Sequence, residues 1–258
     1  YDFRVEYIDD IDWAAVTIGW KPLKDNLLQE AIEVAKKSDA VIIVLGSRND
    51  TEGEHLDRQS LDLLPEQEKL LQKVYEVNPN IVLTLVNGSP ISVNWADENI
   101  PAIVEAWYPG QAEGVAIAEV LFGDYNPGGK LPITIPKAAS DLPAFEDYDI
   151  TKGKTYMYQR IEPLYPFGFG LSYTDFEVSN ESMLKQQLSK DKVIEISFDL
   201  KNMGSMQGSE VVQLYIRKNN EVLGNPIKIL KAFERVFLAE GEKQRITLSF
   251  PITELARY

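Results

Sequence analysis

The sequence contains no cysteine and only one histidine, His55. Without cysteine there is no disulfide, no thiolate zinc site and no iron–sulfur cluster, and one histidine cannot build a histidine-rich metal cage. A serine–histidine catalytic triad would have to use His55. We therefore expect this chain to hold neither a metal ion nor another cofactor.

The sequence also lacks long apolar runs and an excess of positive charge. No run approaches the roughly 20 apolar residues that cross a bilayer, so we expect no membrane span. The 258 residues include 26 basic and 40 acidic side chains, a net charge of −14. Such an acidic chain is poorly suited to bind nucleic acid or anionic lipid. The acidic excess lies entirely before residue 166, which predicts a domain boundary near Tyr165.

Strand and helix patterns alternate in residues 23–137. Helical periodicity covers 21–38, 64–77 and 111–122, and apolar β-type runs cover 39–46, 81–86 and 101–107. This alternation predicts an α/β fold, an open and mostly parallel sheet flanked by helices. Ligands of such sheets bind where the strands end. The loops at those ends are residues 46–62, 87–90 and 108–111, and the first is long and rich in charge, which is typical of functional loops.

The remaining segments have other patterns. Residues 1–22 alternate apolar and polar side chains as in two terminal strands. Residues 138–173 are rich in proline, glycine and aromatic residues with little periodicity, which indicates an extended connector. Residues 174–258 show repeated strand patterns separated by turns, and they predict an all-β sandwich that is incomplete at Tyr258.

The loop after the first strand contains an unusual concentration of charged and titratable residues. Residues 47–58 contain four carboxylates, two arginines and the histidine. The simpler interpretation is a solvated loop whose ion pairs each contribute under about 1 kcal/mol. The position of the loop, directly after a buried strand, favours a functional interpretation. There an Asp–Arg pair that fixes the loop would leave a neighbouring glutamate free to titrate. A buried carboxylic acid can donate a proton near neutral pH, as in hydrolases that use paired carboxylates. Glu54 and Glu52 are the candidates.

Five segments of the chain occur in the order found in one enzyme family. They are Glu54-His55-Leu56-Asp57-Arg58 with Leu61-Asp62-Leu63, Pro65 and Gln67, then residues 86–91, 106–111, 121–132 and 163–174. They resemble the C-terminal α/β-sandwich domain of glycoside hydrolase family 3, which includes many β-glucosidases and β-xylosidases. Residues 174–258 resemble the family's fibronectin type III-like domain, most clearly at 230–236. Residues 1–22 resemble the end of a protective-antigen-type β-insert.

The resemblance implies a retaining exo-β-glycosidase that releases terminal non-reducing sugars from oligosaccharides or glycosides. It implies Glu54 as the general acid/base, from the spacing to Asp57 and Arg58, with Glu52 as the alternative. The nucleophilic aspartate of such enzymes lies on an N-terminal (β/α)8 barrel, for which this sequence has no pattern. We therefore expect the chain alone to be inactive. The implied partners are a carbohydrate substrate and that barrel, and a homo-oligomer is compatible with the sequence.

Further residues are candidates for supporting the site. Asp57 and Arg58 are expected to hold the loop through an ion pair. Trp107 favours packing at a strand end over service as a sugar platform. Tyr156 and Tyr158 are candidates for an aromatic rim that contacts a sugar or aglycone. Glycan degradation is compatible with a periplasmic or secreted location, which the sequence leaves open.

Two other functions compete with the enzyme. A non-catalytic module that binds glycan or scaffolds a partner predicts a shallow polar surface around Glu54. The enzyme predicts a concave face with that glutamate directed toward the absent domain. A nucleotide-binding domain is disfavoured, because no phosphate-binding glycine motif follows a strand.

Overall fold

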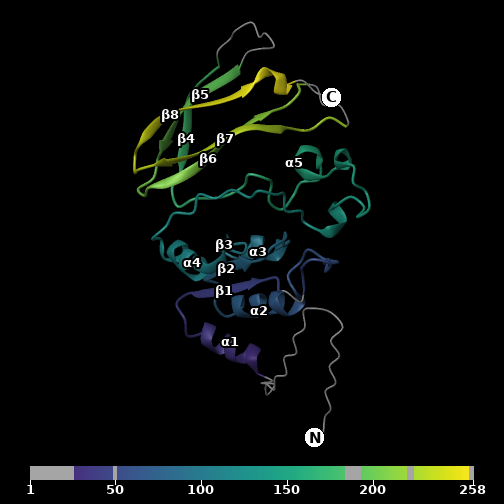
Figure 1. Cartoon of the computed structure of the whole chain (residues 1–258). Coiled ribbons are helices and arrows are strands. Elements are labelled where there is room, and N and C mark those ends of the chain that lie inside the picture. The colour runs from purple at the N-terminus through teal and green to yellow at the C-terminus, as the bar shows by residue number, and fades with distance from the viewer. Residues whose placement is uncertain (1–25, 49–50, 184–192, 220–223, 256–258) are drawn as a thin grey trace, which may run out of the picture.

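The computed structural model describes residues 26–48, 51–183, 193–219 and 224–255. The strands predicted in residues 1–22 lie outside these ranges. A domain with a parallel sheet is followed by an antiparallel β-sandwich, and extended chain runs between them (Figure 1).

The first sheet is parallel, as the sequence predicts. It contains β1 (Val41–Gly46), β2 (Ile81–Val86) and β3 (Ala102–Glu105) in the order β1-β2-β3. Val41 pairs with Ile81, and Val82 pairs with Ala102. Because the strands are parallel, their carboxyl ends meet along one edge. The loops that were predicted to carry function therefore begin side by side.

Four helices accompany this sheet: α1 (Leu27–Ala35), α2 (Pro65–Tyr75), α3 (Asn94–Asn99) and α4 (Glu113–Phe122). Helix α2 has proline at its first position, acidic residues in its first turn and Lys73 in its last, which suits the helix dipole. Helix α4 ends at Gly123, whose φ of 79° forms a left-handed cap. The sequence predicts α1, α2 and α4 but not α3, which is too short to show helical periodicity.

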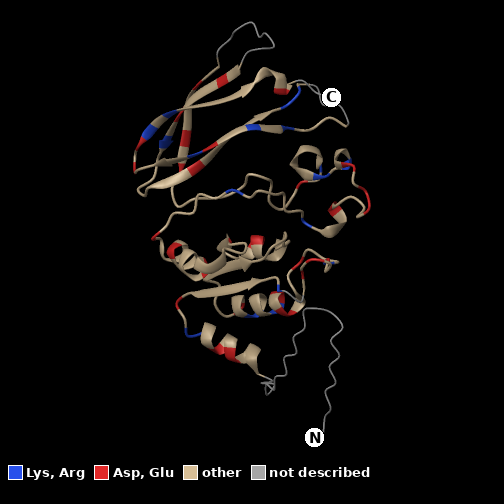
Figure 2. Cartoon of the chain, viewed as in Figure 1, with Lys and Arg blue, Asp and Glu red and all other residues tan. Residues whose placement is uncertain are grey.

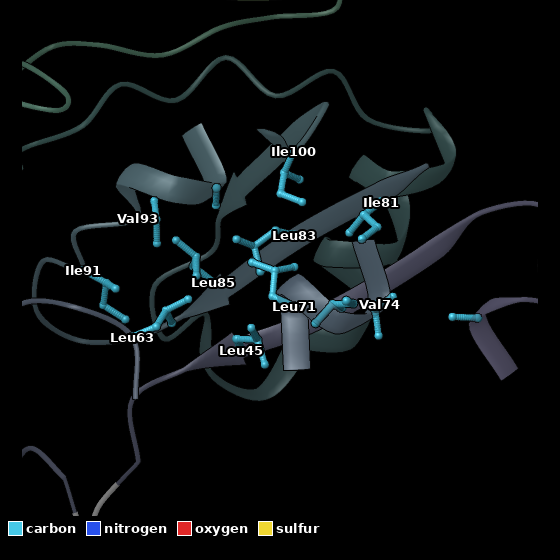
Figure 3. Packing of buried hydrophobic residues seen from close by; sticks show 13 residues of the cluster. Leu45, Leu63, Leu71, Val74, Ile81, Leu83, Leu85, Ile91, Val93 and Ile100 are labelled. Atoms are coloured by element: carbon cyan, nitrogen blue, oxygen red, sulfur yellow. The ribbon is translucent and has the colours of Figure 1, made fainter. Parts of the chain in front are cut away.

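One face of the parallel sheet carries the apolar core. Ile43 and Leu45 of β1 pack with buried residues of α1, α2, α3 and β2 (Figure 3). Ile42 and Val44 point to the opposite face, where they are 48% and 56% exposed. The apolar helix α4 has no buried residue. Within the described part of the chain, one side of this domain is therefore incompletely covered.

The second domain is a sandwich of two antiparallel sheets. Its strands are β4 (Phe176–Met183), β5 (Val193–Asn202), β6 (Gly208–Ile216), β7 (Ile229–Leu238) and β8 (Lys243–Pro251). The sheets have the orders β4-β5-β8 and β6-β7. The buried cluster includes Leu200 of β5 and Leu238 of β7, so both sheets contribute to one core.

Two segments that overlap the predicted family motifs 121–132 and 163–174 join the domains. Residues 124–137 and 163–174 pair through backbone hydrogen bonds, with Ile135 and Tyr165 donating to each other at 2.8 and 3.1 Å. Lys130 Nζ donates to Gly170 O at 2.7 Å and lies 3.0 Å from Glu210 of β6. These motif residues therefore connect the two domains. Between the two segments lies the short helix α5 (Thr155–Tyr158).

The described residues contain neither a candidate membrane-spanning helix nor a candidate metal cluster. None of the helices there is both long and apolar enough to span a bilayer. No cluster of three or more histidine, aspartate or glutamate side chains in those ranges is arranged to hold a metal ion.

Candidate active site

The candidate site lies where β1, β2 and β3 end and their loops begin. Gln67 of α2 fastens the end of β1, because its amide donates to Gly46 O at 2.9 Å and accepts from Gly46 N–H at 3.4 Å. Gly46 has a φ of 147°, and a Cβ there would lie 1.9 Å from Val86 O. Only glycine therefore fits where β1 passes β2. The charged loop starts from this fixed point, and Figure 2 shows acidic residues along it.

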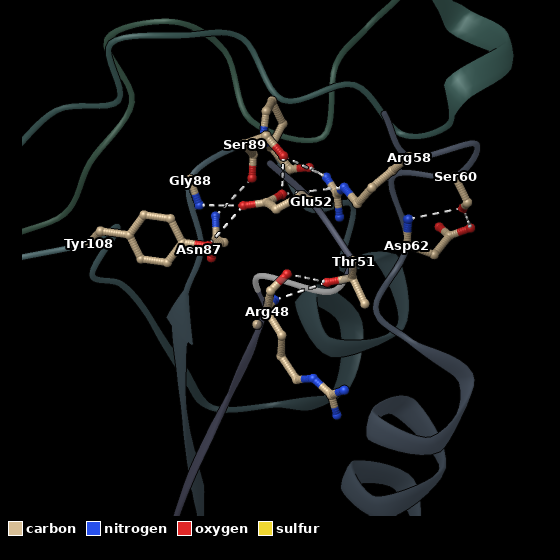
Figure 4. Close-up of polar contacts among 12 residues, drawn as sticks. Arg48, Thr51, Glu52, Arg58, Ser60, Asp62, Asn87, Gly88, Ser89 and Tyr108 are labelled. Carbon is tan, nitrogen blue, oxygen red and sulfur yellow. Dashed lines mark hydrogen bonds and ion pairs between the residues drawn. The ribbon is translucent and has the colours of Figure 1, made fainter. Parts of the chain in front are cut away.

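Glu52 connects the loops after all three strands (Figure 4). Its Oε1 accepts hydrogen bonds from Gly88 N–H and from the Tyr108 hydroxyl, both at 2.9 Å. Its Oε2 accepts from Ser89 Oγ at 2.5 Å. The side chain is only 12% exposed. Glu52 therefore anchors the charged loop to the loops after β2 and β3.

Arg58 completes this network from the far end of the loop. Its Nε lies 3.5 Å from Glu52 Oε2, and its Nη2 donates to Ser89 Oγ at 3.0 Å and to Pro90 O. Asp57 is exposed and makes no hydrogen bond or ion pair with any described residue. The expected Asp57–Arg58 pair is therefore wrong. Arg58 pairs with Glu52 instead, because Glu52 turns inward while Asp57 faces solvent.

The electrostatics of Glu52 suit an anchor. Burial alone would raise the pKa of its carboxyl, but hydrogen bonds led by those from Ser89 and Gly88 outweigh burial and lower the pKa. Tyr108 shifts the other way, because burial and its hydrogen bond to the Glu52 carboxylate raise the pKa of the phenol. Glu52 therefore stays ionised at neutral pH and acts as a hydrogen-bond acceptor.

Glu54 has the opposite environment. It lies in a tight turn in which Leu56 N–H donates to Gly53 O at 3.0 Å, and His55 adopts a left-handed φ of 65°. The Glu54 side chain is 91% exposed, and its Oε1 lies 3.8 Å from His55 Nε2. The concave face expected around Glu54 is therefore not formed by the described residues, since the turn extends the side chain into solvent.

Glu105, the last residue of β3, belongs to the same edge and was not predicted. Its Oε1 accepts from Trp107 N–H at 3.1 Å, and its Oε2 accepts from Asn87 Nδ2 at 3.4 Å. Burial raises the pKa of the Glu105 carboxyl to about 7, although these two hydrogen bonds lower it in part. The signal in the sequence was a carboxylate near the end of an apolar strand.

The predicted aromatic residues lie in different surroundings. Trp107 is partly buried and has a left-handed φ of 55°. Tyr156 stacks on Phe167 with ring centroids 4.4 Å apart, and its hydroxyl accepts from Leu230 N–H at 3.0 Å. Tyr158 is only 9% exposed. Tyr156 thus packs within the connector and against β7, and the contact of these two tyrosines with a sugar stays a prediction.

Family models match most of the chain. Residues 4–173 match the glycosyl hydrolase family 3 C-terminal domain, and residues 210–258 match a fibronectin type III-like domain. A β-xylosidase of Formosa agariphila is 40% identical over 230 residues, which are 88% of this chain and 32% of that protein. Thermostable β-glucosidase B of Acetivibrio thermocellus is 38% identical over 248 residues, which are 92% of this chain and 33% of that protein.

Solved structures show the same relationship. The β-glucosidase from Kluyveromyces marxianus in complex with glucose has a TM-score of 0.81 and 34% identity, and the match covers 91% of this chain and 30% of that one. The β-glucosidase from Bifidobacterium adolescentis has a TM-score of 0.81 and 34% identity, with 91% and 36% covered. The chain thus spans about a third of the length of these relatives. It belongs to glycosyl hydrolase family 3, in which it corresponds to the C-terminal domain and the fibronectin type III-like domain that follows.

Proposed function

We propose that this chain is the C-terminal part of a retaining exo-β-glycosidase of the β-glucosidase type, and that its charged loop supplies the general acid/base. Relatives named β-glucosidase and β-xylosidase support the reaction class. The observation that carries the proposal is the anchoring of the loop at the sheet edge by Glu52 and Arg58. This anchoring fixes the backbone and leaves the Glu54 carboxyl available for chemistry.

The two glutamates take separate roles in this proposal. Glu54 protonates the glycosidic oxygen while a nucleophilic carboxylate from the barrel attacks the anomeric carbon and the bond to the leaving group breaks. The Glu54 carboxylate then removes a proton from the water that hydrolyses the glycosyl-enzyme. Glu52 serves as the anchor, because both its oxygens already accept hydrogen bonds from the neighbouring loops.

The exposure of Glu54 fits this division of labour. A barrel packed over the loop would remove the Glu54 side chain from water, which is the condition under which a carboxyl group donates a proton near neutral pH. Other apolar surface is also uncovered, since Val115 and Phe122 of α4 are 63% and 78% exposed. Contiguous exposed apolar surface is typical of faces that contact further protein.

The proposal is tested by kinetics in the intact protein that joins this chain to its barrel. E54Q should reduce turnover of a substrate with a poor leaving group by about 10²- to 10⁴-fold, because the leaving oxygen then lacks its proton donor. A substrate with a dinitrophenolate leaving group needs no protonation, so kcat/KM for this substrate should change far less. Its kcat should still fall, because hydrolysis of the glycosyl-enzyme lacks its general base.

E52Q is the matched control, since it changes a glutamate of the same loop in the same way. It should slow both substrates to a similar degree, because it loosens the loop without removing the proton donor. Unchanged kinetics in E54Q would remove Glu54 from the mechanism. A leaving-group dependence in E52Q would transfer the acid/base role to Glu52.

A non-catalytic glycan-binding module remains the second candidate, and the exposure of Glu54 favours it. The two functions differ in the behaviour of the chain alone. As part of a glycosidase, the 258-residue chain should neither hydrolyse an aryl β-glucoside nor bind a gluco-oligosaccharide, because the sugar site needs the barrel. Saturable binding measured by isothermal titration calorimetry would instead support the module.

A further inference from the structure

We propose that Glu105 is a positioning residue, whose carboxyl holds the loops after β2 and β3 in the arrangement that anchors Glu52. The arrangement of the loops is independent of the enzyme's reaction. Only the effect of Glu105 on catalysis rests on the proposed function.

The first argument is the placement of the Glu105 side chain. The carboxyl lies at the end of β3, and each of its oxygens contacts a different loop, through Trp107 N–H at 3.1 Å and Asn87 Nδ2 at 3.4 Å. Asn87 is fully buried, and its amide also donates to Ser89 O at 2.9 Å. One carboxyl group therefore connects the two loops beneath the Glu52 network.

The second argument is the backbone at Trp107. Its φ of 55° lies in the left-handed region, which a bulky side chain seldom adopts unless its surroundings impose it. The hydrogen bond from Trp107 N–H to Glu105 is a contact that favours this conformation. The next residue is Tyr108, whose hydroxyl donates to Glu52 at 2.9 Å. The conformation at Trp107 thus sets the direction from which Tyr108 reaches Glu52.

The third argument is that the residues of the network are closely packed. A Cβ on Gly88 would lie 2.6 Å from the ring of Tyr108 and 3.1 Å from Glu52 Oε1. The backbone of one loop, the aromatic ring of the other and the anchor carboxylate are therefore in close contact. A shift of either loop by a few tenths of an ångström changes the position of Glu52, and with it the turn that carries Glu54.

The test compares E105M with E105Q. Methionine keeps the side-chain length and suits a partly buried site, but it removes both hydrogen-bond acceptors. Glutamine keeps an acceptor oxygen for Trp107 N–H. In hydrogen–deuterium exchange on the 258-residue chain, E105M should raise exchange in peptides covering 86–91 and 105–110 by about tenfold or more, because protection falls with local stability. E105Q should stay near the wild type.

Peptides from α2 report global stability in the same experiment and should be unchanged. Wild-type exchange of both loops in E105M would overturn the proposal. Equal increases in α2 and the loops would overturn it as well, because they would make Glu105 a general stabilising residue.

A second readout in the intact protein links Glu105 to catalysis. E105M should lower kcat by about tenfold or more with little change in KM, because misplacing a catalytic group by a fraction of an ångström is costly. E105Q should recover most of the activity. Loosened loops with an unchanged kcat would overturn the catalytic part and place the acid/base elsewhere. Failure of the proposed function would thus be distinguished from failure of the positioning role, which the exchange data test alone.

Discussion

Two glutamates that are two positions apart differ almost completely in environment. The Glu52 side chain is 12% exposed and the Glu54 side chain is 91% exposed. The spacing of the motif favours Glu54 as the acid/base, but it does not reveal that Glu52 is the anchor. The donors to Glu52 lie 36 to 56 residues later in the chain, at Gly88, Ser89 and Tyr108. Their convergence is a tertiary property, and local sequence patterns do not encode it.

The same limit explains the error at Asp57 and the surroundings of the two tyrosines. The partner of Arg58 could not be inferred from adjacency, because Asp57 faces solvent while Arg58 reaches Glu52 and Ser89. Tyr156 and Tyr158 precede a family motif, but the connector folds against β7, and this long-range contact decides their burial. Contacts between segments that lie far apart in the sequence could therefore not be predicted from local patterns.

Glu105 gives the chain a dependence of stability on pH. Its pKa is about 7 in the folded protein, against an ordinary value of 4.5. Between these values the folded state binds more protons than the unfolded state, so the free energy of unfolding falls as pH rises. From pH 4.5 to 8, the free energy of unfolding of E105Q should rise by about 2–3 kcal/mol relative to that of the wild type, at about 1.4 kcal/mol per pKa unit. Urea unfolding across this range measures the gain, and parallel curves for both proteins would contradict it.

Gly88 offers a steric test of the anchor. G88A places a methyl group against the Tyr108 ring and Glu52 Oε1, and it should destabilise the fold by about 1–3 kcal/mol. G53A is the control, because a Cβ at Gly53 meets nothing within 4 Å, and it should change stability by less than about 0.5 kcal/mol. Thermal unfolding followed by circular dichroism compares the two. Equal stabilities would show that the contacts at Gly88 relax freely.

At the level of elements, the sequence predicts helices and strands well where a periodic or apolar pattern extends over many residues. The apolar runs at 81–86 and the helical pattern at 111–122 correspond to β2 and α4. Helix α3 was missed because six residues cannot display a 3.6-residue period. The strand expected over 101–107 ends at Glu105, where the left-handed Trp107 turns the chain out of the sheet. Short helices and strand ends therefore depend on contacts that a periodic pattern does not contain.

The junction between α2 and β1 gives an element-scale prediction. Q67A removes the side chain that makes hydrogen bonds with both backbone groups of Gly46. It should lower the free energy of unfolding by about 1–3 kcal/mol. Q72A in the same helix removes only a 3.4 Å contact to Glu68 and should cost under about 0.5 kcal/mol. Chemical unfolding of both variants measures the difference. Similar losses would show that Gln67 does not fasten the helix to the strand.

At the scale of the whole molecule, the connector couples two differently built domains. The preceding segment, residues 124–137, also contacts the sandwich, through the Lys130–Glu210 ion pair, whose side chains are only 15% and 21% exposed. K130A should destabilise the protein by about 1–3 kcal/mol, because it leaves Glu210 partly buried without its cation. Scanning calorimetry should then show the two domains unfolding in more clearly separated transitions.

Lys137 provides the comparison for this prediction. It lies 3.9 Å from Glu162, and the two side chains are 50% and 89% exposed. K137A should therefore change stability by less than about 0.5 kcal/mol, as expected for a solvated pair. A K130A profile that matches K137A would show that the interdomain pair does not couple the domains.

Chemical rescue is the most direct test of the claim that Glu54 is the acid/base. Azide is an anion that can attack the glycosyl-enzyme without giving up a proton, so it needs no general base. With an activated aryl β-glucoside, the intact E54Q protein should regain turnover as azide is added and release a β-glycosyl azide. The wild type and E52Q should yield the free sugar. If E54Q gives no glycosyl azide, or if E52Q is the variant that gives it, Glu54 is not the acid/base.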